Sequence, residues 1–305
     1  MTSYYAHGLQ IDSEIPLPEL RPGSNRAADV HIRYGPVPTA LPDPVKSCGF
    51  FQAAPDTLLL TVKDVGRYLV THGRDIVVEP LPDCSEDLVR VFLLGSTFGA
   101  LLHQRHLLVM HASSIETARG AVLFVGPRGH GKSTLLAALV DRGHAMLADD
   151  VTAVSVESPS GPVAFGAFPR QRLCTDTATR FDHPLEALPR VPSSNKYLVP
   201  VPRFCPGPLP VHAIYALDVH EAADIHLEPV SAAQSFALVG GNTYRSAFLF
   251  GLGLSRMHFH AAARLARSVQ VACVTRPVTP FMLDELVDRL EEEFGGPEVS
   301  RTVPQ

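Results

Sequence analysis

One short stretch of the chain carries residue types at the spacing that phosphate binding requires. Residues 126–133 read Gly-Pro-Arg-Gly-His-Gly-Lys-Ser, the complete G-x-x-x-x-G-K-S pattern of a phosphate-binding loop (P-loop, or Walker A motif). The glycines let backbone N–H groups turn inward around a phosphate chain. A helix that starts at the end of such a loop adds a partial positive charge.

Two residues of this loop have specific expected roles. Lys132 would reach the β- and γ-phosphates of ATP, and the Ser133 hydroxyl would bind Mg²⁺. The alternative is a chance glycine-rich turn before a helix, which is disfavoured because the motif and its flanking elements agree. We predict that the nucleotide is bound by Gly126, Pro127, Arg128, Gly129, His130, Gly131, Lys132, Ser133 and Thr134.

Two adjacent carboxylates follow the loop at the end of a short apolar run. Residues 146–150 read Met-Leu-Ala-Asp-Asp, which predicts a strand with Asp149 and Asp150 at its carboxyl end. In a parallel α/β sheet that end faces the ligand crevice. One acid there can hold Mg²⁺ while the other accepts a proton from an attacking hydroxyl, because neighbouring carboxylates near a metal separate their pKa values. A solvated turn after a strand is the alternative.

A histidine precedes the loop at a distance that a strand pair would bridge. His111 lies fifteen residues before Gly126 and directly follows an apolar strand pattern at 107–110. A turn at 118–120 and a second strand from Ala121 would bring it near the loop. Taken alone, a histidine at a strand end is more often structural than catalytic, so both roles stay open.

The surrounding pattern predicts the elements that position these residues. Residues 121–125 are an apolar strand, and residues 133–140 form a helix whose apolar side includes Leu135, Leu136 and Leu139. A capped, apolar core helix is expected over 88–104, with Ser85 as its N-cap. Strand, loop and helix in this order indicate an α/β fold with a P-loop catalytic domain over residues 83–305.

The first part of the chain has a different character. Residues 1–82 contain short alternating runs typical of strands, and prolines cluster between 36 and 55. We expect a smaller β-rich N-terminal module there, without a catalytic constellation. Docking, regulation and simple packing are its three open roles.

The segments after Asp150 give weaker signals. Arg170 and Arg172 could contact phosphate or substrate, but a solvated loop is the favoured interpretation. The proline-rich residues 176–202 are expected to form a long flexible loop over the site. Residues 240–245 are expected to form a loop, and His258 and His260 are interpreted as surface residues.

Composition limits the compartment and the classes of partner. The formal net charge of −5 gives no global attraction for nucleic acid, and no apolar run reaches the length of a membrane span. The start of the chain lacks the features of a secretion signal. The five cysteines are scattered, with no C-x-x-C pair, as expected for reduced thiols in a cytoplasmic protein.

Taken together, His111, the loop and the segment Arg-Gly-His-Ala-Met-Leu-Ala-Asp-Asp at 142–150 resemble the catalytic domain of HPr kinase/phosphorylase. The resemblance covers about forty residues, His111 to Asp150. It implies that Lys132 and Ser133 bind nucleotide and metal, that Asp150 accepts the proton of a target serine, and that His111 supports the acidic pair. Asp149 would be the acid on the metal side, although the roles of the two aspartates could be exchanged.

The chain also departs from that family. The family's later arginine- and glycine-rich signature, with a metal-binding glutamate, is not recognisable, and Gly-Ala-Phe-Pro-Arg-Gln-Arg-Leu occupies its place. The opening of the chain, with Ser-Glu-Ile-Pro-Leu-Pro-Glu-Leu at 13–20, looks like a divergent branch of HPr-kinase-like proteins. Some members of that branch are associated with ribosomally made peptides, including lasso peptides, and phosphorylate a serine of the precursor.

Three functions are therefore open. The first is a serine kinase that uses ATP and Mg²⁺ and acts on a peptide or protein, for which a ribosomally made precursor peptide is one candidate. The second is a small-molecule kinase of the same fold, favoured by a compact pocket beside Asp150. The third is a nucleotide-binding switch or peptide-presenting module, favoured if Asp150 is remote from the loop. Expected partners exclude nucleic acid and membrane, and a homo-oligomer stays open.

Overall fold

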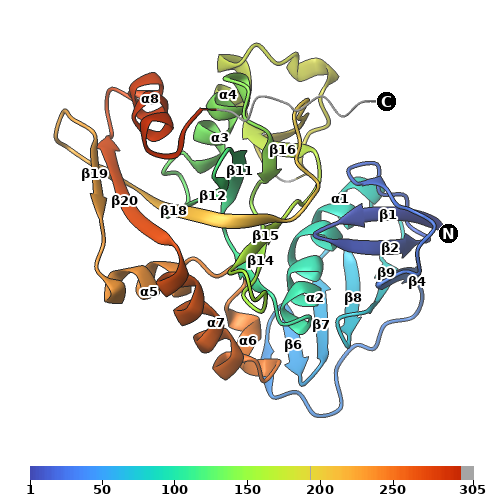
Figure 1. The fold of residues 1–305 in the computed structure, drawn as a ribbon. Coiled ribbons are helices and arrows are strands. Elements are labelled where there is room, and N and C mark those ends of the chain that lie inside the picture. Colours follow the sequence, from blue (N-terminus) through green and yellow to red (C-terminus); the bar gives the residue numbers. More distant parts are fainter. Residues whose placement is uncertain (193, 297–305) are drawn as a thin grey trace.

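The computed structural model describes residues 1–192 and 194–296. This part of the chain contains two nine-stranded sheets and one two-stranded sheet, with helices against them (Figure 1). The strands of residues 2–80 all belong to the first large sheet, and later strands build the other two. The chain is therefore mixed α/β, and its division into two domains stays a prediction.

The first sheet has the order β3-β1-β2-β4-β9-β8-β7-β6-β5 and is mostly antiparallel, with parallel pairs only at β2–β4 and β4–β9 among the described strands. Alternation in the sequence explains its buried face, as in β8, where every second residue is buried. The strands are β1 (Thr2–Ala6), β2 (Leu9–Ser13), β3 (Arg21–Pro22), β4 (Val30–Tyr34), β5 (Lys46–Cys48), β6 (Phe51–Ala54), β7 (Thr57–Val62), β8 (Gly66–Thr71) and β9 (Asp75–Pro80).

A long helical segment covers this sheet and shares its core. The segment consists of α1 (Glu86–Phe92), a π-helical stretch (Leu93–Thr97) and α2 (Phe98–Gln104). The predicted cap is confirmed, since the Ser85 side chain accepts a hydrogen bond from the Leu88 N–H. The core also takes in Ala153 and Phe248, so residues far along the chain complete the packing of the first sheet.

The second large sheet has the main order β10-β14-β15-β18-β12-β11-β13, with β20 against β18 and β19 against β20. Its centre is parallel at β12–β18 and β18–β20, while β11 runs antiparallel to both β12 and β13. The expected parallel sheet is thus a mixed one. The strands are β10 (Leu108–Met110), β11 (Ser113–Thr117), β12 (Gly120–Val125), β13 (Met146–Ala148), β14 (Thr152–Ser155), β15 (Val163–Phe165), β18 (Leu209–His220), β19 (His226–Pro229) and β20 (Gln270–Pro277).

Strand β12 is apolar throughout because it is buried on both faces. Ala121, Leu123 and Val125 share a core with α5 and α7, whereas Val122 and Phe124 share one with α3 and α8. Figure 1 shows α3 and α8 on one side of this sheet and α5 and α7 on the other. The helices are α3 (Lys132–Asp141), α5 (Ala232–Gly241), α6 (Ala247–Gly251), α7 (Ser255–Ser268) and α8 (Leu283–Phe294).

The described residues of the segment 176–202, expected to be a long loop, contain regular elements, so that prediction is wrong. It contains α4 (Thr175–Arg180), a 3₁₀ turn (Leu185–Ala187) and β17 (Lys196–Pro200). Strand β17 pairs with β16 (Arg170–Cys174) as an antiparallel two-stranded sheet. Buried Leu173 and Val199 anchor this pair against Ala137 of α3 and Ala178 of α4, which offsets the breaking effect of the prolines.

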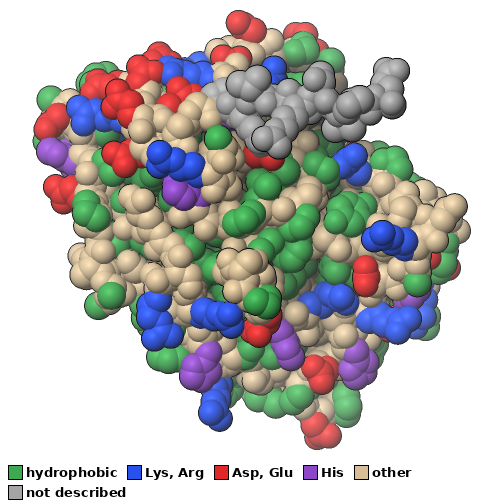
Figure 2. Space-filling view, viewed as in Figure 1, with side chains coloured by type: hydrophobic (Ala, Val, Ile, Leu, Met, Phe, Trp, Pro, Cys, Tyr) green, Lys and Arg blue, Asp and Glu red, His purple; other side chains and the backbone are tan. Residues whose placement is uncertain are grey.

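No helix in the described part of the chain is both long enough and apolar enough to cross a membrane. On the face drawn in Figure 2, acidic and basic side chains are interspersed. That face therefore presents no broad field of one sign.

Candidate functional site

The carboxyl ends of β12 and β13 and the start of β11 lie at the same end of the second large sheet. Strands β12 and β13 run in the same direction because each pairs antiparallel with β11, which lies between them. Ser113 at the start of β11 stands opposite Phe124, and Ser114 stands opposite Ala148. The loop after β12, the acids after β13 and the residues before β11 consequently meet at one edge.

The phosphate-loop segment adopts a backbone that its glycines permit. Gly126, Gly129 and Gly131 have φ angles of 134°, 90° and 93°, values that other residues rarely adopt. A Cβ on Gly126 would approach the carbonyl oxygen of Leu217 to 2.4 Å, so this position also requires glycine for space. Helix α3 begins at Lys132, directly after the loop, as the motif predicts.

Lys132 is held against its own loop. Its Nζ donates to the carbonyl oxygens of Gly126 at 2.6 Å and Pro127 at 3.1 Å, and the residue is only 8% exposed. Burial lowers the pKa of this amine, while Asp150 and Asp149 oppose that shift. The Lys132 ammonium group therefore lies against the loop carbonyls, within the electrostatic field of both carboxylates.

Asp149 connects the loop to the neighbouring strand. Its Oδ1 accepts hydrogen bonds from the hydroxyls of Ser113 at 2.9 Å and Ser133 at 3.2 Å. Its Oδ2 accepts from the backbone N–H of Arg172 at 2.9 Å. Burial raises the pKa of this carboxyl, and the nearby charge of Asp150 adds to the rise, although the bonds from Arg172 and Ser113 oppose it.

Asp150 lies beside Asp149 with a left-handed backbone. Its φ of 71° is a value that aspartate and asparagine adopt more readily than most residues other than glycine. Its carboxylate contacts Nη1 of Arg172 at 3.2 Å and Nδ1 of His111 at 3.4 Å. His111 Nδ1 also lies 3.1 Å from the carbonyl oxygen of Asp150, so it contacts both the backbone and the side chain of that residue.

Arg172 is therefore part of the site, and its interpretation as a solvated loop residue is wrong. It lies on β16, and both its backbone N–H and its guanidinium bind the acidic pair. Its neighbour Gln171 donates to the carbonyl oxygen of Ser133 at 2.7 Å, which joins β16 to the first turn of α3. A short arginine-containing run did not distinguish a strand from a loop.

Residues of the 240–245 segment also support the site, which the sequence did not indicate. The Asn242 side-chain oxygen accepts from the Gly126 N–H at 3.0 Å, and its backbone carbonyl accepts from the His111 N–H at 2.7 Å. The Tyr244 ring lies 6.1 Å from the His111 ring, centroid to centroid. The segment thus fixes both the first residue of the loop and the histidine.

His258 is not the surface residue that the sequence predicted. It is half-buried, and its Nε2 lies 2.7 Å from the Thr243 hydroxyl, so it supports the 240–245 segment and is not a surface residue. Burial lowers its pKa. His260 is exposed, as expected.

These residues surround a cleft of about 510 Å³. It brings together most of the predicted site, whereas Gly126, Pro127 and His130 are not among its lining residues. The His130 carbonyl accepts from the buried Arg276 at 3.5 Å, and that guanidinium lies 4.2 Å from the Phe281 ring. The cleft is lined by His111, Ser113, Arg128, Gly129, Gly131, Lys132, Ser133, Thr134, Asp149, Asp150, Arg172, Cys174, Thr177, Asn195, Lys196, Tyr244 and Arg245.

The donor set fits a nucleotide phosphate chain with Mg²⁺. In the described part of the chain, the N–H groups of Arg128, Gly129 and Gly131 have no protein acceptor, so they are free to bind phosphate oxygens. Nothing lies within 4 Å of a Cβ placed on Gly129, which leaves the loop open on that side. Hydroxyl and carboxylate oxygens of Ser133 and Asp149 are the ligand type that Mg²⁺ prefers.

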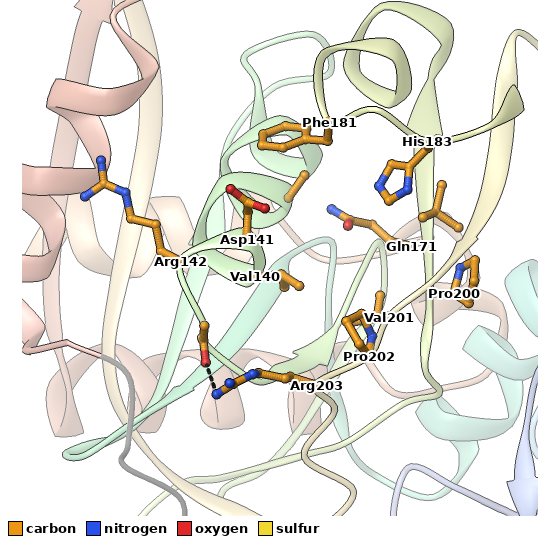
Figure 3. A pocket seen from close by; sticks show the side chains of 13 residues that line it. Val140, Asp141, Arg142, Gln171, Phe181, His183, Pro200, Val201, Pro202 and Arg203 are labelled. Carbon is orange, nitrogen blue, oxygen red and sulfur yellow. Dashed lines mark hydrogen bonds between the residues drawn. The ribbon is translucent and has the colours of Figure 1, made fainter.

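A second cavity of about 400 Å³ lies on the far side of the β16–β17 pair (Figure 3). It is lined by residues of α3, of the segment that follows α4 and of the segment after β17, including Val140, Phe181 and Arg203. The Arg203 guanidinium donates to the carbonyl oxygen of Gly143. Gln171 lines this cavity and also donates to the Ser133 carbonyl next to the phosphate loop. It lacks the loop, the acidic pair and His111, so it is not the predicted site.

Comparison with known proteins adds little to this geometry. No family model matches the chain, and no curated protein matches it. Among solved structures, the HPr(Ser) kinase/phosphatase from Coxiella burnetii is similar to 62% of this chain and 99% of its own, at 16% sequence identity and a TM-score of 0.29. At that TM-score the likeness is too loose to support a functional argument.

Proposed function

We propose that this protein is an ATP-dependent kinase that transfers the γ-phosphoryl group to a serine hydroxyl of a peptide or protein. The observation that supports this most is the position of Asp150. Its carboxylate lines the same cleft as Lys132 and Ser133, held between Arg172 and His111. A remote Asp150 would have favoured a switch without transfer chemistry.

The phosphate chain would be bound by the free N–H groups of the loop and by Lys132. The Lys132 amine would exchange its bonds to the Gly126 and Pro127 carbonyls for bonds to phosphate oxygens, remaining charged beside the two carboxylates. Ser133 and Asp149 would hold Mg²⁺, which neutralises charge on the phosphates when bound. The bond between Ser133 and Asp149 already aligns these two ligands.

Asp150 would act as the base. As the serine oxygen bonds to the γ-phosphorus, the bond from that phosphorus to the bridging oxygen of ADP breaks, and the serine proton passes to the Asp150 carboxylate. Arg172 and His111 contact this carboxylate from two directions and fix its orientation. Positioning of this kind is most of what phosphoryl transfer requires from a protein.

The size of the cleft favours one further candidate. A volume of about 510 Å³ lies within the range of small-molecule sites. A kinase that phosphorylates a small hydroxyl compound would therefore use the same residues as a protein kinase. The peptide or protein acceptor is preferred because of the resemblance of residues 111–150 to a family of protein serine kinases. A ribosomally made precursor peptide is one candidate acceptor.

Single-turnover transfer separates these candidates. The purified chain would be mixed with radiolabelled ATP and Mg²⁺, and then with serine peptides, proteins or small hydroxyl compounds. Labelled phosphoserine in a peptide or protein supports the proposal, while label only in small compounds supports the second candidate. Tight ATP binding without transfer to any acceptor would favour a nucleotide-binding switch.

A further inference from the structure

The β16–β17 pair has one packed face and one open face. Gln171, Leu173 and Val199 are buried on the packed face, against α3 and α4. The pairing register places Arg172 opposite Leu198 and Arg170 opposite Pro200 on the other face. Those four residues are partly or fully exposed, so the open face carries two arginines beside apolar side chains.

A second groove lies beside the cleft along this open face. Arg172 lines the cleft, while its pairing partner Leu198 lines a groove of about 280 Å³, together with Arg170 and Pro200. Because Arg172 and Leu198 are opposite one another in the strand pair, the groove is a neighbour of the site that contains Asp150.

The far wall of the groove comes from the segment between β2 and β3 and from α1. Pro18 and Glu19 lie in the segment between β2 and β3, and Arg90 and Val91 lie on α1. Figure 1 shows α1 and the β1–β2 end of the first sheet on the side of the molecule that carries β16. The groove is therefore built jointly by the β-rich N-terminal residues and by the strand pair that holds the acidic residues.

The charges along the groove leave arginine unpaired. Arg90 is paired with Glu19 at 2.9 Å and with Asp87, so these charges largely satisfy one another. Arg170 and Arg190, which both line the groove, have no ion-pair partner among the residues that the structure describes. The remaining lining is mostly apolar, with Leu188, Pro189 and Leu198 among it. A ligand with apolar and acidic side chains matches this surface.

We propose that the groove binds the acceptor chain next to its target serine, as an extended segment with an apolar side chain against Leu198 and an acidic side chain at Arg170. This inference rests on the proposed kinase function. It also assigns a role to the N-terminal residues, whose segment between β2 and β3 supplies part of one wall of the acceptor groove. The position of the groove beside the cleft and the charge of Arg170 select the acceptor as the occupant.

Strand geometry sets the expected spacing. Arg170 and Arg172 are two residues apart on one face of a strand, which corresponds to roughly 7 Å. An extended peptide covers the same distance in two residues. Arg172 contacts Asp150, where the target serine would lie. The acidic side chain of the acceptor that binds Arg170 is therefore expected about two to four residues from that serine, on one side of it.

A binding selection tests this inference apart from the chemistry. A library of twelve-residue peptides with a central serine and randomised flanks would be applied to the immobilised full chain with a non-hydrolysable ATP analogue and Mg²⁺. Retained peptides are sequenced for the parent, Arg170→Glu and Leu198→Asn. Arg256→Glu is the matched control, because Arg256 is exposed on α7, and no α7 residue lines the groove or the cleft.

The parent and Arg256→Glu should enrich acidic and apolar residues at the stated positions. Arg170→Glu should lose acidic enrichment by about tenfold and select Lys or Arg there, and Leu198→Asn should lose only the apolar preference. Unchanged acidic enrichment in Arg170→Glu, or none in the parent, overturns the groove assignment. Selective binding without phosphate transfer would instead contradict the kinase proposal, and transfer without positional preference would contradict only the groove.

Discussion

Ser133 and Asp149 are joined by a hydrogen bond of 3.2 Å across sixteen positions of the chain. The same Asp149 oxygen accepts from Ser113 at 2.9 Å. One carboxylate oxygen thus connects the first turn of α3, the end of β13 and the start of β11. This arrangement places a metal-type oxygen set next to the phosphate loop before any nucleotide binds, which reduces the reorganisation needed for binding.

Lys132→Ala should reduce phosphoryl transfer by orders of magnitude while the chain stays folded. Within the described residues the amine donates hydrogen bonds to loop carbonyls only, and its removal leaves the apolar core around α3 intact. Single-turnover transfer and circular dichroism check the two halves of this prediction. Lys63→Ala is a matched control, because Lys63 is exposed next to β7 and far along the chain from the loop. Parent-level transfer in Lys132→Ala would remove the loop from the active site.

The raised pKa of Asp149 should make the stability of the folded chain depend on pH and on Mg²⁺. Because its pKa is raised in the folded chain, the folded state binds its proton more tightly than the unfolded state does. The stabilisation is complete below the unfolded pKa of about 3.9 and is lost as the pH rises through the raised folded value. Asp149→Asn should therefore gain Tm relative to the parent as the pH rises across this window, without metal.

Mg²⁺ should reverse that relation. The metal favours the ionised carboxylate, so at neutral pH it should raise the Tm of the parent more than that of Asp149→Asn. Thermal melts with and without Mg²⁺ and a nucleotide analogue provide the measurement. Equal metal-induced shifts in both proteins would contradict the assignment of Asp149 to the metal, and would favour the exchanged roles in which Asp150 holds it.

The local part of this site could be predicted from the sequence. The loop, the strand before it and the helix after it follow from a dense pattern of glycines and apolar residues within residues 121–141. The meeting of Asp149 with Ser133 was also expected, although for a parallel sheet. The two residues also meet in the mixed sheet, because β12 and β13 run in the same direction on either side of β11.

The remainder depends on contacts between distant segments. Arg172 reaches Asp150 because β16 is held by Leu173 and Val199, and the proline-rich sequence around them concealed this pairing. Asn242 reaches Gly126 across 116 positions, and no local pattern indicates such a bond. Residue types indicated where the candidate site lies, while Arg172 and Asn242, which contact its residues, were apparent only in three dimensions.

Asn242→Ala should weaken nucleotide binding without altering the chemistry of the acidic pair. The variant removes the acceptor of the Gly126 N–H, and loss of such a bond costs about 0.5–1.5 kcal/mol, or roughly a twofold to tenfold change in affinity. Asn242→Asp keeps an oxygen at this place and is expected to restore most of the affinity. Calorimetry with an ATP analogue gives both values. Equal losses in the two variants would show that the amide NH₂ bond to Leu238, and not the bond to Gly126, matters.

Asp150→Asn separates a base from a structural acid. The φ of 71° suits asparagine as well as aspartate, so the backbone should be retained. The amide oxygen can still accept from Arg172, which preserves the side-chain position. The amide cannot take the serine proton, and general-base help is typically worth about 10²–10⁴-fold in rate.

The expected result is therefore a loss of transfer with nucleotide and Mg²⁺ affinity nearly unchanged. His111→Ala should give a smaller loss, mainly in rate, because this residue contacts Asp150 and orients it. Single-turnover transfer and calorimetry on both variants test this order of effects. If Asp150→Asn transfers phosphate at the parent rate, another group accepts the proton. If it instead loses metal-dependent nucleotide binding while Asp149→Asn keeps it, the two aspartates have exchanged roles.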